Sequence, residues 1–253
     1  MRVSLNQSNQ EPMIALQWII NCIRIALIFV WTAICAMVGI VLMLLLWNGS
    51  RVHYLTGYYL YAPGTLFLAG VRVTVSGLDN LNRNLPHIFV SNHASHLDVV
   101  CIARVIPMGL FFIAKQELKR TPFLGQYMAV IGHIFVDRKN KDKALESLRL
   151  AGDKIKAGKD VITFPEGTRT KTGELMLFKR GSFMIAKDGG IPVMPIAVIG
   201  TRAILPSGGW MIRPGRVHIA IGKSIGVEEF AHLSVEQLAD LARIRVDQLL
   251  RSK

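Results

Sequence analysis

Cysteine is scarce in this chain, and its few cysteines form no recognisable pattern. Cys22, Cys35 and Cys101 each lie among apolar residues, with neither the spacing of a disulfide framework nor that of a metal site. The chain therefore does not read as a disulfide-stabilised secreted domain. Its cysteine usage is consistent with a reducing compartment.

Two motifs that would indicate other enzyme classes are missing. No G-x-S-x-G nucleophile elbow occurs, which argues against a serine hydrolase of the α/β-hydrolase type. A partial P-loop match, "IGKS" at Ile221 to Ser224, has Val217 where that motif requires glycine. Internal repeats, low-complexity linkers and signs of a second soluble domain are absent from the sequence as well.

Acidic residues are few relative to basic ones. The sequence has 17 Asp and Glu against 30 Lys and Arg, a formal net charge of +13. Such a charge calls for an anionic partner, and nucleic acid and an anionic membrane surface are the two candidates. The apolar N-terminal part favours membrane lipids, so we expect no nucleic-acid partner.

One long segment lacks charge altogether. Residues Ile25 to Trp47 read "IALIFVWTAICAMVGIVLMLLLW" and would form a helix roughly 35 Å long, enough to cross the hydrocarbon core of a bilayer. The mean hydropathy of +0.36 is high for a soluble protein. We expect a transmembrane helix, with a deeply embedded hairpin also compatible. A cleaved signal peptide fits less well, because the run is too long and no small-residue cleavage motif closes it.

The basic residues follow this run almost without exception, since only Arg2 and Arg24 precede it. The positive-inside tendency then places the main domain in the cytoplasm, at the inner membrane if the source is bacterial. The next segment, Tyr54 to Gly70, mixes tyrosines with apolar residues as an interfacial helix does, although a core helix is equally compatible. We therefore expect a membrane-anchoring region over residues 1–70 and a catalytic domain over 71–253.

Strands and helices alternate in the second part of the chain. Short apolar or alternating runs lie at 71–77, 87–92, 110–114, 133–136, 161–164, 192–200 and 216–222. Between or after them, residues 143–158 carry an apolar helical stripe, and Ser234 with Gln237 forms a capping box that opens a C-terminal helix. This order predicts an α/β fold, with a largely parallel sheet of about seven strands flanked by helices.

The stretch "SNHASHLDVV", Ser91 to Val100, carries two histidines and an aspartate between apolar residues. A strand should end near Asn92 and a helix should have Asp98 in its first turn, so His93 would lie in the strand-to-helix turn. The Asp98 carboxylate can then hold one imidazole nitrogen while the other faces substrate, as in bases that activate a hydroxyl. From this segment alone, a solvated His93 and a helix-capping Asp98 remain an equal alternative.

A metal site is a further interpretation of the same stretch. His93, His96 and Asp98 together offer imidazole and carboxylate groups of the kind that bind zinc or iron. Further ligands would be required, and the other histidines show no paired spacing. The sequence therefore favours a site without metal.

A second polar motif follows the run at 161–164. In "FPEGTRT", Phe164 to Thr170, a carboxylate, a glycine and a guanidinium lie in a tight turn where a strand ends, which is where open α/β sheets bind ligands. Arg169 can grip a phosphate with two parallel hydrogen bonds, and Gly167 lets the backbone approach a ligand closely. Three more basic residues follow, at Lys171, Lys179 and Arg180. A solvated basic face explains those three at least as well as a binding role.

Four segments together resemble the ordered blocks of the glycerolipid acyltransferase family. They are "NHASHLD" (92–98), "GHIFVDR" (132–138), "FPEGTRT" (164–170) and "IPVMPIAV" (191–198). Their order and separations are most similar to those of the 1-acyl-sn-glycerol-3-phosphate acyltransferases, and the resemblance runs from about Val71 to Gly222. The adjoining "AKQEL" and "FKRGSFMIA" also look like sequence of this family.

The resemblance implies a role for each matching position. His93 would be the general base that deprotonates a glycerol hydroxyl, Asp98 would fix its tautomer, and His96 would serve in packing or in contact with the donor. Transfer would be direct, without a covalent enzyme intermediate, a cofactor or a metal. The substrate-binding residues would be Glu166 and Gly167 around the acceptor, Arg138 and Arg169 on its phosphate with Lys115 as a helper, and Pro195, which would fix a strand end near the acyl donor.

The function implied by the resemblance is one step of phospholipid biosynthesis. An acyl group would pass from acyl-CoA or acyl carrier protein to the sn-2 hydroxyl of 1-acyl-sn-glycerol-3-phosphate (lysophosphatidic acid), forming phosphatidic acid. Alternatives keep the chemistry but change the acceptor to a lyso-ornithine lipid or another lysophospholipid, or transfer acyl groups between phospholipids. A basic membrane-binding module without activity would explain the charge of +13 but not the four ordered blocks.

Overall fold

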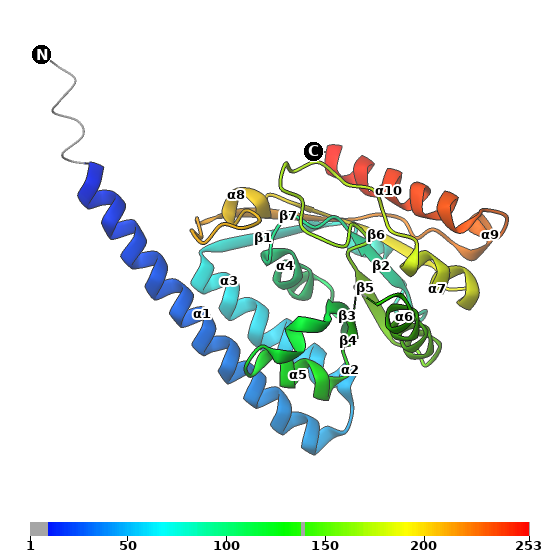
Figure 1. The fold of residues 1–253 in the computed structure, drawn as a ribbon, viewed down its shortest axis with the longest axis horizontal. Coiled ribbons are helices and arrows are strands. Elements are labelled where there is room, and N and C mark those ends of the chain that lie inside the picture. Colours follow the sequence, from blue (N-terminus) through cyan, green and yellow to red (C-terminus); the bar gives the residue numbers. More distant parts are fainter. Residues whose placement is uncertain (1–9, 138–139, 253) are drawn as a thin grey trace, which may run out of the picture.

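A computed structural model describes residues 10–137 and 140–252 of the chain. Its centre is one sheet of seven strands in the order β1-β7-β6-β2-β5-β3-β4 (Figure 1). The strands are β1 (Val71–Ser76), β2 (Ile88–Ser91), β3 (Leu110–Lys115), β4 (Ile134–Val136), β5 (Asp160–Thr163), β6 (Val193–Ile199) and β7 (Gly215–Ile221). Each lies within two residues of a run predicted from the sequence, and the α/β fold class is confirmed.

Strand direction decides where the polar turns meet. All neighbouring strands are parallel except β6 and β7, which are antiparallel. The carboxyl ends of β2, β5 and β6 therefore lie at one edge of the sheet, although these strands are far apart in the chain. Ligands bind at such an edge in open α/β sheets, and the turns after these strands carry the polar motifs found in the sequence.

Helices cover both faces of this sheet. One face packs against α3 (Ala62–Ala69) and α4 (Leu97–Val105), and the other against α6 (Lys141–Lys156), α7 (Gly181–Gly189) and α10 (Val235–Arg251) (Figure 1). The remaining short helices are α2 (Gly49–His53), α5 (Leu124–Ile131), α8 (Thr201–Ile204) and α9 (Val227–Phe230). The predicted capping box at the start of α10 is confirmed, with reciprocal bonds between Ser234 and Gln237.

The long apolar helix is α1 (Gln10–Leu46), which begins well before the predicted Ile25. Within the described residues it is the one helix long and apolar enough to cross a membrane, over Ile14–Leu46. Its second half packs against α3 and α5 (Figure 1), and Gly39 permits this close approach because a Cβ there would clash with the Tyr127 ring. The opposite side of α1 exposes large apolar side chains.

The segment predicted as interfacial, 54–70, forms a π-helical stretch, Tyr54–Tyr61, that continues into α3. Gly70 ends α3 in the left-handed conformation (φ 68°), which is costly for other residues. Tyr59 and Phe67 point outward, with 60% and 84% of their surface exposed. A domain boundary at residue 70 stays a prediction.

A buried polar chain ties α2 and the π-helical stretch to α5. The Thr56 hydroxyl donates to the Val52 carbonyl (2.8 Å), so it accepts from the Tyr127 hydroxyl (2.5 Å). That phenol in turn accepts from Nδ1 of His53 (3.0 Å), whose ring lies 4.7 Å from the His133 ring. Burial lowers the pKa of His53 to about 4 and holds the pKa of His133 well below its usual range.

This cluster should make the fold sensitive to mild acid. His53 titrates near 6.5 when unfolded and near 4 when folded, so the unfolded chain binds the proton first. The contribution of neutral His53 to the free energy of unfolding is complete above pH 6.5. It falls as the pH drops and is reduced by up to about 3 kcal/mol near pH 4. We expect the melting temperature in detergent to fall less between pH 7 and pH 5 in His53→Gln than in the wild type.

The glutamine amide can still donate to Tyr127, so His53→Gln removes the titration while keeping a hydrogen-bond donor. His232→Gln is the matched control, because that histidine is exposed. Parallel pH curves for the wild type and both variants would contradict the assignment to His53.

Candidate active site

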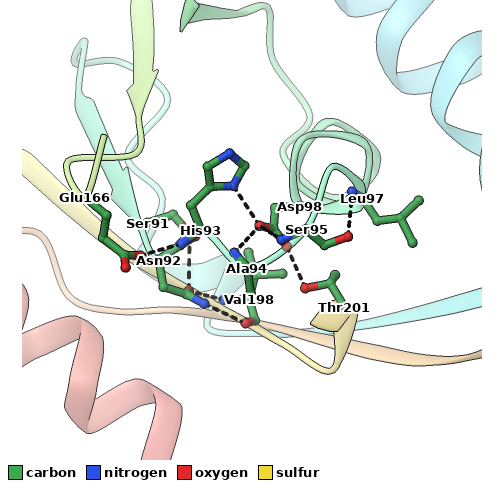
Figure 2. Close-up of polar contacts among 10 residues, drawn as sticks. All are labelled: Ser91, Asn92, His93, Ala94, Ser95, Leu97, Asp98, Glu166, Val198 and Thr201. Carbon is green, nitrogen blue, oxygen red and sulfur yellow. Dashed lines mark hydrogen bonds and ion pairs between the residues drawn. The ribbon is translucent and has the colours of Figure 1, made fainter. Parts of the chain in front are cut away.

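The catalytic candidates lie in the turn between β2 and α4. Asn92 holds this turn against β6, because its amide donates to the Val198 carbonyl (2.9 Å) and accepts from the Val198 N–H (2.8 Å) (Figure 2). The two bonds continue the sheet by one side chain beyond the end of β2. His93 follows directly, so the position of its backbone is set by the sheet.

Asp98 is the centre of the turn and is fully buried. One carboxylate oxygen, Oδ2, accepts from Nδ1 of His93 (2.8 Å) and from the N–H groups of Ala94 (2.7 Å) and Ser95 (2.9 Å). The other, Oδ1, accepts from the Thr201 hydroxyl (2.6 Å) (Figure 2). The buried charge is thus hydrogen-bonded on both oxygens and sits in the first turn of α4, where the helix dipole favours an anion.

The His93 ring is fixed by two contacts. A carboxylate can only accept, so the bond to Asp98 requires a proton on Nδ1, and the neutral imidazole then has its lone pair on Nε2. The ring also stacks on Phe164, with centroids 4.1 Å apart and planes 20° apart. Its side chain is 17% exposed, so a substrate hydroxyl can reach it. His93 and Asp98 are in contact as the sequence predicted, and their roles as base and orienting carboxylate stay predictions.

His96 does not take part in this arrangement. It lies on the exposed side of the turn where α4 begins, and its pKa is lowered by the atoms packed around it and by the charge of Arg169. Within residues 10–137 and 140–252, no three His, Cys, Asp or Glu side chains converge in a way that could hold a metal. The geometry therefore gives the metal interpretation no support.

Glu166 reaches the turn from the loop after β5. Its carboxylate accepts the His93 N–H on Oε1 (2.6 Å) and the Met176 N–H on Oε2 (3.1 Å). Only 4% of the residue is exposed, and burial raises its pKa to about 7. The Glu166 side chain thus links the backbone at His93 to the backbone at Met176. If Glu166 shapes an acceptor site, as predicted, it would do so by positioning these two backbone segments.

The rest of the motif closes over the same turn. The Thr170 N–H donates to the His93 carbonyl (2.8 Å), a second link between the two loops. Gly167 adopts φ 75°, and a Cβ at this position would lie 2.6 Å from the Lys179 ammonium. The Lys179 side chain therefore lies directly over the glycine turn, while Arg180 is occupied by an ion pair with Glu236 (2.6 Å).

The three residues predicted to bind phosphate have different surroundings in the structure. Arg169 is half-buried at the edge of the sheet formed by the carboxyl ends of β2, β5 and β6, here called the catalytic edge. It lies close enough to His96 to affect the pKa of that histidine. Lys115 ends β3 as an exposed side chain paired with Glu117 (3.0 Å). Arg138 lies outside the described residues, and its role stays a prediction.

Pro195 does not mark a strand end, so that prediction is wrong. It is the third residue of β6, which continues to Ile199, and it lies beside Val90 of β2. The Gly222 N–H donates to the Pro195 carbonyl (2.9 Å), but proline has no N–H to return the bond, and pairing with β7 is continuous only from Ile196. Contact with an acyl donor stays a prediction.

Sequence reasoning missed three residues that hold the site. Thr201 and Asn92 act through long-range hydrogen bonds, and neither belongs to a local pattern that would have indicated its partner. Phe164 ends the apolar run at 161–164, and its place directly before the "PEG" turn is the signal that could have indicated it. Its stacking on His93 depends on β2 and β5 being neighbours.

Comparison with known proteins agrees with this geometry. A family model described as acyltransferase matches residues 72–199, which include the turns after β2 and β5. The chain belongs to the acyltransferase family. This acyltransferase is therefore an enzyme, and the interpretation as a basic membrane-binding module without activity is wrong.

Relatives of this acyltransferase share most of its length. A 1-acyl-sn-glycerol-3-phosphate acyltransferase of Saccharomyces cerevisiae is 31% identical, covering 90% of this chain and 77% of that protein. One of Pseudomonas aeruginosa is 32% identical, covering 74% of this chain and 72% of that protein. The crystal structure of the 1-acyl-sn-glycerophosphate (LPA) acyltransferase PlsC from Thermotoga maritima matches with a TM-score of 0.66 and 32% identity, covering 74% of each chain.

The bond from Thr201 to Asp98 should be necessary for full activity. Thr201→Val keeps the side-chain shape but leaves Asp98 Oδ1 buried without a donor. An unsatisfied buried acceptor costs about 1–3 kcal/mol, so we expect acyl-transfer turnover to fall about tenfold or more as Asp98 shifts. Thr201→Ser keeps the hydroxyl and should retain most of the activity. Steady-state turnover in detergent measures both, and equal rates for Val and Ser would contradict this role.

Proposed function

We propose that this enzyme transfers a fatty acyl group from acyl-CoA or acyl carrier protein to the sn-2 hydroxyl of 1-acyl-sn-glycerol-3-phosphate, forming phosphatidic acid. The observation that supports the proposal most is the bond from Nδ1 of His93 to Asp98, which fixes the ring and leaves Nε2 of the neutral imidazole available as a base. The names of the relatives support the acceptor, because each is a 1-acyl-sn-glycerol-3-phosphate acyltransferase.

The geometry supports direct transfer with His93 as base and then acid. Nε2 takes the proton of the acceptor hydroxyl as its oxygen attacks the thioester carbonyl carbon, giving a tetrahedral intermediate. Collapse of the intermediate forms the ester and breaks the C–S bond, and the imidazolium returns the proton to the leaving sulfur. Asp98 stabilises the imidazolium between these steps, as the carboxylate does in a Ser-His-Asp triad.

An enzyme nucleophile is not required for this route, and the nearest thiol is poorly suited to be one. Cys101 lies one helical turn after Asp98 on α4, but it is fully buried. Burial raises the pKa of its thiol to about 12, so almost no thiolate is available near neutral pH. The acceptor hydroxyl itself is thus the nucleophile in the proposed reaction.

The basic groups at the catalytic edge support a phosphate-bearing acceptor. Arg169 and the Lys179 ammonium both lie on the loop that Glu166 and Thr170 attach to His93. A phosphate held there would leave the rest of a glycerol unit within reach of the base, and binding energy from the phosphate would position the hydroxyl. An acceptor without phosphate would leave these cations without a ligand. Arg138 would complete the site according to the sequence.

The location that fits this function is a membrane with the catalytic domain in the cytoplasm. The exposed apolar side of α1 supports attachment to lipid, and the distribution of basic residues along the sequence supports the orientation. A water-insoluble acceptor would then reach the site from the bilayer.

A panel of acceptors tests the proposal with purified enzyme in detergent. We expect lysophosphatidic acid to be acylated with the highest kcat/KM, ahead of a lyso-ornithine lipid, lysophosphatidylcholine and monoacylglycerol. Arg169→Lys should lower kcat/KM for lysophosphatidic acid while leaving the donor KM unchanged, because an ammonium cannot reproduce the two parallel bonds of a guanidinium. Product formation is measured by mass spectrometry.

Lys156→Ala, on the exposed side of α6, is the control for simple loss of positive charge. Equal, small effects of Arg169→Lys and Lys156→Ala would sink the phosphate assignment. Preference for an acceptor without phosphate would contradict the proposed substrate.

A further inference from the structure

The N-terminal end of α1 extends beyond the folded domain (Figure 1). From Ile14 to Ile20 every residue is exposed. Apart from Gln17 these residues are apolar. A helix that is apolar on all sides is stable in lipid or in a protein core, and not in water. From Ile14 onward, Asn21 is the first buried residue of α1, and it lies where the helix meets the domain.

A loop of the catalytic domain is bonded to α1 at this point. The Asn21 side chain, 2% exposed, donates to the Trp210 carbonyl (2.9 Å) and accepts from the Ile212 N–H (2.8 Å). Arg24, one turn further along, donates to the Ile212 carbonyl (2.8 Å). Both hydrogen-bonding ends of a buried amide are therefore used to fix the loop of residues 205–214 to the helix.

The fixed loop displays a large apolar side chain. Trp210 is 73% exposed, although its own carbonyl is bonded to α1 and Ile212, two residues on, is buried. Exposing an indole to water is unfavourable, because a large apolar ring is stabilised when it is removed from water. The same junction of loop and helix carries Arg24, bonded to the Ile212 carbonyl, and the exposed Arg213. Tryptophan beside arginine is typical of the level where a membrane protein passes from hydrocarbon to headgroups.

We propose that the loop 205–214 is a second membrane contact, with Trp210 inserted at the headgroup level of an anionic bilayer next to the point where α1 leaves the domain. The apolar arm Ile14–Ile20 ends next to Asn21, which is bonded to this loop, and the arm requires the same lipid environment. The net charge of +13 favours anionic lipid over a neutral surface. Lipid is therefore the partner that satisfies the arm, the indole and the arginines together.

This contact would connect the membrane to the catalytic carboxylate. The loop begins directly after α8, whose first residue, Thr201, donates to Asp98. The four-residue helix α8 thus connects the loop to Asp98, because its first residue, Thr201, is bonded to that carboxylate. The proposal concerns where the protein touches lipid, and it holds whichever lyso-lipid is the acceptor.

Tryptophan fluorescence in vesicles tests the proposal on the full chain. One variant keeps Trp210 alone, with Trp18, Trp31 and Trp47 changed to phenylalanine, and is reconstituted in vesicles of phosphatidylcholine and phosphatidylglycerol. Lipids brominated on the acyl chain quench indoles in the bilayer, whereas acrylamide quenches those in water. We expect strong quenching of Trp210 by bromolipid and protection from acrylamide.

Two reference variants calibrate the result. A protein with Trp18 alone reports on the apolar arm, and a protein with all four tryptophans replaced by phenylalanine and Leu150→Trp reports on the exposed surface of α6. Trp210 should lose as much fluorescence to bromolipid as Trp18 does, and Leu150→Trp should lose little. Circular dichroism and acyl-transfer activity confirm that each variant is folded.

Three outcomes would overturn the proposal. Quenching of Trp210 by acrylamide to the same degree as Leu150→Trp would place the loop in water. Protection from both quenchers would indicate that a second copy of the chain, or another part of it, covers the indole. If bromolipid quenched neither Trp18 nor Trp210, neither the arm nor the loop would lie in lipid.

Discussion

The buried carboxylate of Asp98 is the constraint on which the site depends. Four donors from two parts of the chain, residues 93–95 and Thr201, meet its two oxygens, and each donor is fixed by being bonded there. Two of them form the turn that starts α4, one is the imidazole of His93, and one is the first residue of α8. A buried ionised group is tolerated only when it is bonded in this way, so loss of any donor affects the others. The orientation of His93 and the local folding of the turn are therefore not separable at this residue.

The sheet brings these parts together. The His93 turn, the Glu166 loop and α8 follow β2, β5 and β6, three strands that are adjacent and parallel in the sheet. Their carboxyl ends meet at one edge, where Asn92 adds a further pair of bonds to β6. The reversal of β7 then leads the chain back from this edge after the loop that contacts α1. Because α1 is bonded to that loop, it is connected to the part of the chain that follows the same edge of the sheet as His93.

The sequence predicted the parts of this arrangement that are local. The seven strands are short apolar or alternating runs, and His93 and Asp98 are five residues apart, so their meeting requires only a turn and the start of a helix. Thr201 is 103 residues from Asp98, and Glu166 is 73 from His93, so their partners follow from strand order, which periodicity does not reveal. Pro195 was misplaced for a similar reason, because proline is tolerated inside a strand when a neighbouring ladder starts beside it.

The central claim is that Asp98 keeps the proton of neutral His93 on Nδ1 and leaves Nε2 free to act as the base. The most direct measurement is NMR of protein labelled with ¹⁵N-histidine, with the His93 signals assigned by their loss in His93→Gln. The account predicts a neutral ring protonated on Nδ1, with a strongly downfield proton that moves upfield in Asp98→Asn. A neutral His93 protonated on Nε2, or a spectrum unchanged by Asp98→Asn, would contradict the account.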